Sequence, residues 1–281
     1  MSSPQAPARE RVVALRPDRP LVAIATDPQT PTSRPPVLIV NAGVIHRIGP
    51  HRLHVRLARR LAEIGHAALR LDLSGIGDSG PIPDRLDFRA SAVVDIRDAV
   101  DNLTRDTPDP KAVIFGVCSG ADNALAAAAE DPRIVGLVLV DPPAYVTPQA
   151  RRRHLRGQLR SARFWADLPA KLARRLRRRH AAGNDEASEG RRAPPPQAVY
   201  GQLLRDLTAR GVRILSIYTA AQGVRFNHPD QLFEAFPALR GQVDVLWSPA
   251  ANHTFTALDQ QHALVEAVAD WCRSRFSTHE G

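Results

Sequence analysis

A pentapeptide near the middle of the chain has the residue types and spacing needed for nucleophilic catalysis. Cys118 stands between Gly116 and Gly120, where an apolar run of strand type gives way to a helical run. Such a strand, turn and helix form a nucleophile elbow, whose central residue has strained backbone angles, so the residues two before and two after it must be very small. Taking Ser119 as the nucleophile would place Val117 at one of those positions. We therefore predict that the thiol of Cys118 is the attacking group.

One of the ten histidines is placed to activate this thiol. His253 lies between the last predicted strand and the last predicted helix. In a sheet of this order that loop returns above the elbow, so an imidazole here can serve Cys118 as general base and then as general acid. No cluster of histidines or acidic residues has the spacing of metal ligands. We expect no metal and no cofactor.

A carboxylate is needed to orient this imidazole. After the seventh predicted strand, where an orienting acid is commonly found, the sequence has Gln222, a neutral amide that cannot stabilise an imidazolium. Asp141, at the end of the sixth predicted strand, is the next position from which a carboxylate can reach the same histidine. We predict a triad of Cys118, His253 and Asp141, with Asp230 as the alternative acid.

These residues are carried by alternating predicted strands and helices. Two β-branched runs, 11–16 and 21–26, flank the turn PDRP and predict an antiparallel hairpin. Apolar runs bounded by Pro and Gly predict buried strands, and amphipathic runs between them predict helices. The later strands are expected at 37–41, 67–72, 112–117, 134–141, 212–218 and 243–247, and the helices at 53–64, 90–103, 121–129, 231–236 and 258–276. We expect an α/β fold with a mostly parallel, eight-stranded sheet and helices on both faces.

The alternation is interrupted once, after the sixth strand, by an arginine-rich segment. Of the net charge of +9, residues 151–192 carry +10 and the remainder carries −1. Leucines at helical spacing predict two Arg-faced amphipathic helices, broken near Pro169, followed by a loop over 181–197. The expected divisions are a flexible N-terminus over 1–10, a core over 11–141 and 212–281, and a helical lid over 142–211. Its charge could hold an acidic carrier protein, a CoA-type substrate or an anionic membrane surface, or be only a solvated face.

The amino-acid composition indicates which classes of protein this chain can belong to. In 281 residues, 43% are hydrophobic and 24% charged, which is typical of soluble globular proteins. The two cysteines, Cys118 and Cys272, provide no disulfide framework and suit a reducing compartment. No stretch has the apolar length of a signal peptide or a membrane span, so we expect a cytoplasmic protein without a transmembrane segment. No nucleic-acid-binding motif accompanies the arginines, so we expect no nucleic-acid partner, while a homodimer stays open.

Taken together, the motifs resemble those of the α/β-hydrolases, in the serine-aminopeptidase-like group. The resemblance extends over about 37–276 and is carried by NAG at 41–43, LDLSGIGDS at 71–79, GVCSG at 116–120 and NHTF at 252–255. In having a cysteine at the elbow in place of the common serine, the chain is similar to dienelactone hydrolases, polyhydroxyalkanoate synthases, Dieckmann-type cyclases and exosortase-associated hydrolases.

The resemblance implies an oxyanion hole formed by the backbone N–H groups of Ser119 and Gly43. It implies that Asp72 fixes a loop, and that Arg47 could hold a substrate carboxylate or phosphate or be simply solvated. The function expected is a cofactor-independent acyl hydrolase or acyltransferase acting on an ester or thioester through an acyl-Cys118 intermediate. The alternatives are a carrier-protein-dependent cyclase or thioesterase in a biosynthetic pathway, and a non-catalytic scaffold that binds an acidic partner.

Overall fold

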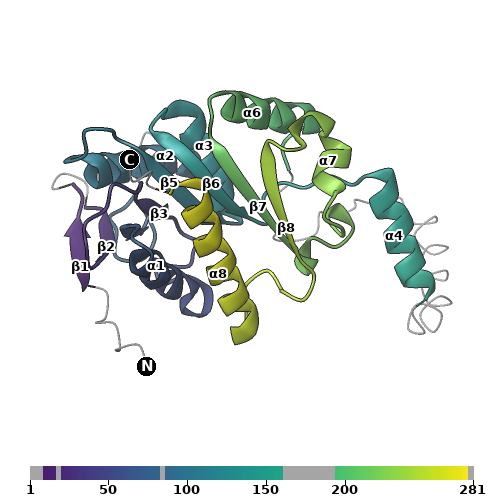
Figure 1. The fold of residues 1–281 in the computed structure, drawn as a ribbon, viewed down its shortest axis with the longest axis horizontal. Helices are drawn as coiled ribbons and strands as arrows, with labels where there is room; N and C mark the ends of the chain where they lie inside the picture. The colour runs from purple at the N-terminus through teal and green to yellow at the C-terminus, as the bar shows by residue number, and fades with distance from the viewer. Residues whose placement is uncertain (1–8, 17–19, 83–85, 161–193, 278–281) are drawn as a thin grey trace.

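The computed structural model describes residues 9–16, 20–82, 86–160 and 194–277 (Figure 1). Its strands are β1 (Arg9–Ala14), β2 (Val22–Asp27), β3 (Val37–Ile39), β4 (Ala68–Leu71), β5 (Ala112–Val117), β6 (Ile134–Val140), β7 (Arg213–Thr219) and β8 (Val243–Ser248). They form one eight-stranded sheet in the order β1-β2-β4-β3-β5-β6-β7-β8. The β1–β2 and β2–β4 pairs are antiparallel and the others parallel, so the predicted fold class and sheet are confirmed.

Helices cover both faces of this sheet. On one face lie α1 (Leu53–Glu63) and α8 (Leu258–Arg275), and on the other α2 (Phe88–Thr104), α3 (Ser119–Glu130) and α6 (Gln197–Ala209). The remaining described helices are α4 (Pro148–Leu159), α7 (Gln231–Ala235) and the short 3-10 helices η1 (Pro50–Arg52), η2 (Ala220–Arg225) and η3 (Pro237–Leu239). Because both faces are covered, the central strands are apolar throughout, as the continuous runs in the sequence predict.

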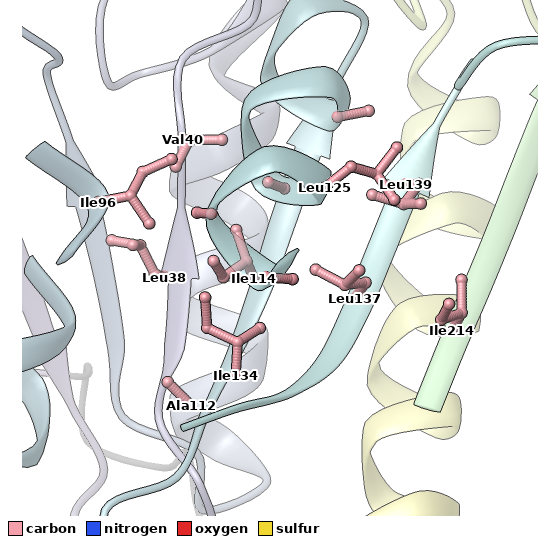
Figure 2. Close-up of a cluster of buried hydrophobic side chains, with 14 of the residues drawn as sticks. Leu38, Val40, Ile96, Ala112, Ile114, Leu125, Ile134, Leu137, Leu139 and Ile214 are labelled. Atoms are coloured by element: carbon pink, nitrogen blue, oxygen red, sulfur yellow. The ribbon is translucent and has the colours of Figure 1, made fainter. Parts of the chain in front are cut away.

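Alternate residues of the central strands supply the two halves of the core. Leu38, Ile114 and Leu137 are fully buried against the face covered by α2, α3 and α6 (Figure 2). Their neighbours Ile39 and Phe115 are fully buried against α1 and α8 on the opposite face. Each such side chain contributes about 2 kcal/mol of transfer free energy. The parallel strands are thereby held in register, which sets where their carboxyl ends lie.

Most element boundaries agree with the expected ones to within two residues. β1 begins at Arg9, so Arg9 and Glu10 belong to the sheet and not to a flexible N-terminus; residues 1–8 lie outside the described part of the chain. The larger difference is α6, which falls inside the predicted insertion. Its residues Tyr200 and Leu204 are buried in the same core as the sheet. The core therefore resumes with α6 and not with β7.

The structure describes the predicted insertion only in part. The break predicted near Pro169, the second predicted helix and most of the loop over 181–197 lie outside the described residues. α4 extends beyond α7 (Figure 1), and among its residues only Ala150 is buried. Within the described ranges, no helix combines the length and the apolar character needed to cross a bilayer.

Candidate active site

Cys118 lies at the turn from β5 to α3, with φ 57° and ψ −118°. A positive φ is uncommon for a residue with a Cβ, so the surrounding backbone must hold it there. The N–H of Cys118 donates to the carbonyl of Val140 in β6 at 2.9 Å, and its own carbonyl accepts the N–H of Ala121 at 3.0 Å. These are the strained angles predicted for the central residue of an elbow.

The two glycines around Cys118 are required by close backbone contacts. A Cβ on Gly116 would lie 2.3 Å from the carbonyl oxygen of Gly120, and a Cβ on Gly120 would lie 2.4 Å from the carbonyl oxygen of Asn41. Neither obstacle is a side chain that could turn away. Only glycine fits at these two positions, which is the steric condition used to select Cys118 over Ser119.

His253 and Asp141 are brought together from the ends of two strands. His253 lies in the loop between β8 and α8, and its Nδ1 is 2.7 Å from Oδ2 of Asp141, which directly follows β6. The buried Asp141 carboxylate also accepts the backbone N–H of Thr219 at 2.8 Å and the Thr219 hydroxyl at 2.7 Å. Donation from Nδ1 to the carboxylate leaves Nε2 of the imidazole available to Cys118, and the two side chains shift each other's pKa.

The interactions among these side chains shift the pKa values of His253 and Cys118 in opposite directions. Hydrogen bonds to Asp141 and to Cys118 raise the pKa of His253 to about 10. The hydrogen bond from His253 lowers the pKa of the Cys118 thiol, and the backbone N–H of Ser119 acts in the same direction. By contrast, burial raises the pKa of Cys272 to about 12. The site therefore favours a thiolate beside an imidazolium, the form in which cysteine is a nucleophile.

Cys118, His253 and Asp141 border a cavity of about 490 Å³. This volume is within the range of small-molecule sites. The cavity is also lined by Gly43 and Ser119, and the N–H of Gly43 donates to Oγ of Ser119 at 3.1 Å. Its apolar wall consists of Pro142, Pro143, Ala144, Pro194, Pro195 and Ala221. A ligand in this cavity would face the reactive groups on one side and the apolar wall on the other.

The structure separates the two candidate acids. Asp230 lies at the start of α7, where its carboxylate is 3.2 Å from the guanidinium of Arg240. Gln222 lines the cavity but carries no charge. Asp141 is thus the carboxylate that contacts His253. Among the described residues, no group of three or more His, Cys, Asp or Glu side chains is arranged to hold a metal ion.

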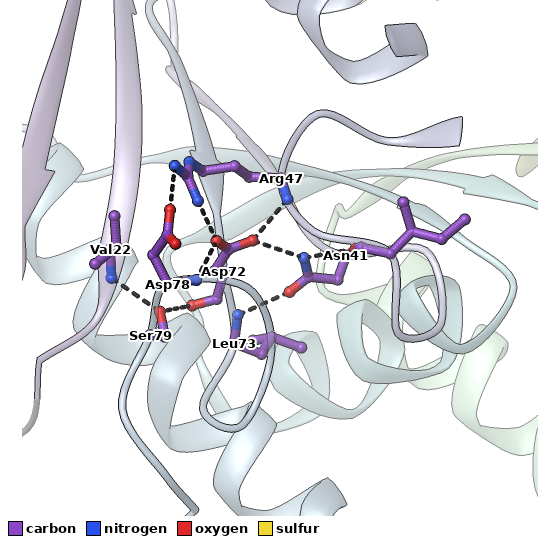
Figure 3. Close-up of polar contacts among 8 residues, drawn as sticks. Val22, Asn41, Arg47, Asp72, Leu73, Asp78 and Ser79 are labelled. Atoms are coloured by element: carbon purple, nitrogen blue, oxygen red, sulfur yellow. Dashed lines mark hydrogen bonds and ion pairs between the residues drawn. The ribbon is translucent and has the colours of Figure 1, made fainter. Parts of the chain in front are cut away.

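Arg47 is placed away from the cavity, in contrast to the substrate-binding role that the resemblance implies. Its guanidinium contacts the carboxylates of Asp72 and, at 2.6 Å, Asp78 (Figure 3). Asp72 also accepts the backbone N–H of Arg47 at 2.6 Å and the amide of Asn41 at 3.1 Å. Asp72 is fully buried, so removing the arginine would leave an uncompensated charge. Asp72 fixes this loop, as expected, and Arg47 neutralises Asp72.

Sequence reasoning did not identify Thr219, and it gave Ser119 a role only through its backbone N–H. Thr219 orients Asp141, and the hydroxyl of Ser119 holds the loop that contains Gly43. The position of Thr219 at the end of β7, beside β6 in the sheet, is the signal that could have indicated it. Its side chain must lie next to the residue that follows β6.

Comparison with known proteins identifies the fold. The family model for serine aminopeptidase, S33, matches residues 40–215, which is more than half of the chain. No curated protein matches the chain. Among solved structures, an α/β serine hydrolase without lid from Xanthomonas campestris, XC6422, is 15% identical, covering 97% of this chain and 96% of that chain with a TM-score of 0.53.

Two further solved structures have the same architecture. The Pyrococcus furiosus esterase Pf2001 is 16% identical, covering 96% of this chain and 93% of that chain with a TM-score of 0.58. A thioesterase domain from the curacin biosynthetic pathway is 17% identical, covering 95% and 99% of the two chains with a TM-score of 0.54. At these identities the likeness establishes the α/β-hydrolase fold.

Proposed function

The chain belongs to the serine aminopeptidase S33 family of α/β-hydrolases, and on that premise we propose that it is a cofactor-independent acyl hydrolase or acyltransferase. Its substrate would be an ester or thioester, cleaved through an acyl-Cys118 intermediate. One observation carries the proposal: Cys118, His253 and Asp141 border one cavity, His253 is hydrogen-bonded to Asp141, and the interaction with His253 lowers the pKa of the Cys118 thiol. A thiolate, a proton carrier and an orienting carboxylate are the groups that such chemistry requires.

In the first half-reaction, the thiolate of Cys118 attacks the acyl carbonyl carbon. The carbonyl electron pair moves onto oxygen, where the backbone N–H of Ser119 donates to the developing oxyanion, a contribution of about 3 kcal/mol per donor. Collapse of this intermediate breaks the bond to the leaving group. The imidazolium of His253 then gives its proton to the departing alkoxide or thiolate.

In the second half-reaction, water or an acceptor hydroxyl attacks the acyl-Cys118 thioester. Neutral His253 takes the proton from that nucleophile, and the Cys118 thiolate leaves as the product forms. Asp141 stabilises the imidazolium each time it appears. Hydrolysis and acyl transfer differ only in whether water or an acceptor hydroxyl attacks the acyl-Cys118 thioester.

The second oxyanion donor that the resemblance implies is the N–H of Gly43. In this structure that N–H is hydrogen-bonded to the Ser119 hydroxyl. Rotation of the Ser119 side chain about its Cα–Cβ bond moves Oγ away from this N–H, so an incoming acyl oxygen can replace it as the acceptor. We assign Ser119 both the first donor, through its backbone, and the placement of the second, through its side chain.

The decisive experiment is intact-protein mass spectrometry during turnover of an activated acyl ester. The wild type should gain one acyl mass, and Cys118→Ala should gain none and lose turnover by at least about a thousandfold. Cys272→Ala is the matched control, because burial and a raised pKa make that thiol unreactive, and it should still be acylated. Turnover by Cys118→Ala with inactivity of Ser119→Ala would move the nucleophile by one residue. No adduct and no turnover in the wild type would favour a binding scaffold.

A further inference from the structure

A second cavity, of about 950 Å³, lies between α4 and η2 and has no part in the function proposed above. One of its walls is the arginine-bearing face of α4. The opposite wall includes Ala220 and Gly223 of η2 and Trp247 of β8. α4 is attached to this wall at its first turn, where the side-chain amide of Asn227 donates to the carbonyl of Ala150 at 2.9 Å.

The α4 wall concentrates positive charge on one surface. Arg152 and Arg156 of α4, and Arg160 at the C-cap that follows it, line the cavity and are spaced four residues apart, so they lie along one face of the helix. Neither α4 nor the described lining of the cavity contains an aspartate or glutamate. Like charges at this spacing repel one another, so a polyanion that pairs with them is favoured. Guanidinium groups match phosphate by paired, parallel hydrogen bonds.

The opposite wall adds a flat aromatic surface. The half-buried indole of Trp247 lines the cavity, and its ring centroid is 5.6 Å from that of Phe226, which supports it from the core. An aromatic face beside a group of cations suits a ligand that joins a planar base to phosphate groups. A nucleoside phosphate has groups that match both walls, whereas a simple fatty acid offers the arginines one carboxylate and has no planar base for the indole.

The two cavities share one short element. Ala221, Gln222 and Arg225 of η2 line the Cys118 cavity, while Ala220 and Gly223 of the same element line the α4 cavity. A ligand with a narrow, extended arm can therefore place its charged end beside α4 and its reactive carbonyl beside Cys118.

We propose that the α4 cavity binds the nucleotide end of a coenzyme A thioester, an inference that rests on the proposed acyl-Cys118 function and defines its acyl donor. Arg152, Arg156 and Arg160 bind the phosphates, the indole of Trp247 stacks on the base, and the pantetheine arm passes η2. The Cys118 thiolate forms a bond to the thioester carbon, and the bond from that carbon to the coenzyme sulfur breaks. The departing coenzyme thiolate takes the proton of His253, so one thioester is exchanged for another.

The test compares three thioesters of one acyl group, carried by pantetheine, by phosphopantetheine and by coenzyme A. The value of kcat/KM should rise along this series, with coenzyme A about tenfold or more above pantetheine at low salt, the effect of about two exposed charge pairs. Replacing Arg152, Arg156 and Arg160 together by Gln should remove most of that ratio, and so should high salt. Arg153 is left unchanged because it also acts on the carboxyl of Glu234.

A matched control replaces three exposed arginines elsewhere on the surface by Gln, namely Arg89, Arg105 and Arg273. This control changes the net charge by the same amount and should keep the preference for coenzyme A. An equal loss in both variants would show a general charge effect and overturn the inference. A kcat/KM that is higher for the phosphopantetheine thioester than for the pantetheine thioester, but no higher for the coenzyme A thioester, would overturn the nucleotide assignment, since a carrier-protein arm bears the same phosphate.

Calorimetric titration of coenzyme A into Cys118→Ala separates this inference from the proposed function. The variant should bind coenzyme A more tightly than pantetheine, and the triple arginine substitution should abolish that difference. Equal affinities for the two ligands would overturn the inference while leaving acylation of Cys118 intact. Tight binding of coenzyme A by a wild type that never forms an acyl adduct would support the cavity assignment and reject the acyl-enzyme function.

Discussion

The carboxylate of Asp141 and the imidazole of His253 are 112 residues apart in the chain and are joined by a hydrogen bond of 2.7 Å. Asp141 follows β6, His253 follows β8, and β7 lies between these strands in the sheet. The last residue of β7, Thr219, donates two hydrogen bonds to the same carboxylate. Three neighbouring strands thus each contribute one residue to the placement of a single imidazole.

Loss of the Asp141 charge should greatly lower the rate of turnover. Asp141→Asn should lower kcat by about ten thousandfold, the effect seen when an orienting carboxylate in a triad becomes an amide. Asp230→Asn is the matched control and should remain near wild type, since Asp230 pairs with Arg240 at the surface. Steady-state kinetics on an activated ester measures both. Greater inactivation by Asp230→Asn than by Asp141→Asn would reverse the assignment.

Thr219 is expected to act as a positioning residue. Thr219→Val removes the hydroxyl that donates to Asp141 and should lower kcat by about ten- to a hundredfold, the value of a hydrogen bond to a charged group, with little change in KM. Thr219→Ser keeps the hydroxyl and should restore most of kcat. A change confined to KM, or a Ser variant as impaired as the Val variant, would contradict this role.

The reactivity of Cys118 toward iodoacetamide should persist to lower pH than that of an ordinary cysteine. The lowered pKa of the thiol means that thiolate remains at pH values where an ordinary cysteine, with a pKa of about 8.5, is protonated. The rate should fall only as the pH drops through this lowered pKa. Asp141→Asn weakens the main cause of the raised His253 pKa, so the midpoint should move upward.

The rate at which intact protein forms the iodoacetamide adduct, measured at a series of pH values, gives this pH profile directly. Cys272→Ala should have the same profile as the wild type, because Cys272 is buried and its pKa is raised. A midpoint at or above that of free cysteine would exclude a stabilised thiolate at position 118.

Substitution of Gly120 should unfold the elbow. Gly120→Ala forces a Cβ to within 2.4 Å of the Asn41 carbonyl oxygen and should destabilise the protein by about 3 kcal/mol, toward the upper end of overpacking effects. Gly157→Ala, in α4, meets no atom within 4 Å and should leave Tm unchanged or slightly raised. Thermal unfolding by circular dichroism compares them. Equal Tm values for the two variants would contradict the steric account.

The ion pair beneath the loop at 41–47 should be important for stability. Arg47→Gln leaves the buried Asp72 carboxylate without its cation and should cost about 3–5 kcal/mol. Arg59→Gln, which removes an exposed pair with Glu10, should cost less than about 1 kcal/mol. Chemical denaturation measures both. A stable Arg47→Gln variant with a raised KM would instead restore the substrate-binding role.

Local patterns allowed the sheet and the elbow to be predicted. Strands buried on both faces are continuous apolar runs, as in 134–140, and a parallel sheet follows from their alternation with amphipathic helices. The elbow was predictable because its steric requirement acts within five residues, from Gly116 to Gly120. The order of strands then indicated which loops lie above it, and so led to His253 and Asp141.

The remaining features depend on partners that are distant in sequence. Arg47 could be placed beside Asp72 only when the ends of β3 and β4 were known to be adjacent. Thr219 required the pairing of β6 with β7. The helix α6 is separated from the preceding core strand by the arginine-rich segment, so the order of elements in the sequence does not indicate that α6 packs on the core. In each case the missing information is a contact between segments that are distant in the sequence, and periodicity along the chain does not contain it.

The backbone angles of residue 118 have a consequence for the chemistry open to this scaffold. The turn around residue 118 depends on the close backbone contacts of Gly116 and Gly120, and the side chain at 118 has no part in those contacts. A serine would therefore occupy the same place without any movement of the chain. It would not share a stable charge pair with His253, because a hydroxyl holds its proton far more tightly than a thiol does. Exchange of one atom, sulfur for oxygen, would thus replace a thiol whose pKa is lowered by His253 with a hydroxyl that must give up its proton to His253 in every turnover.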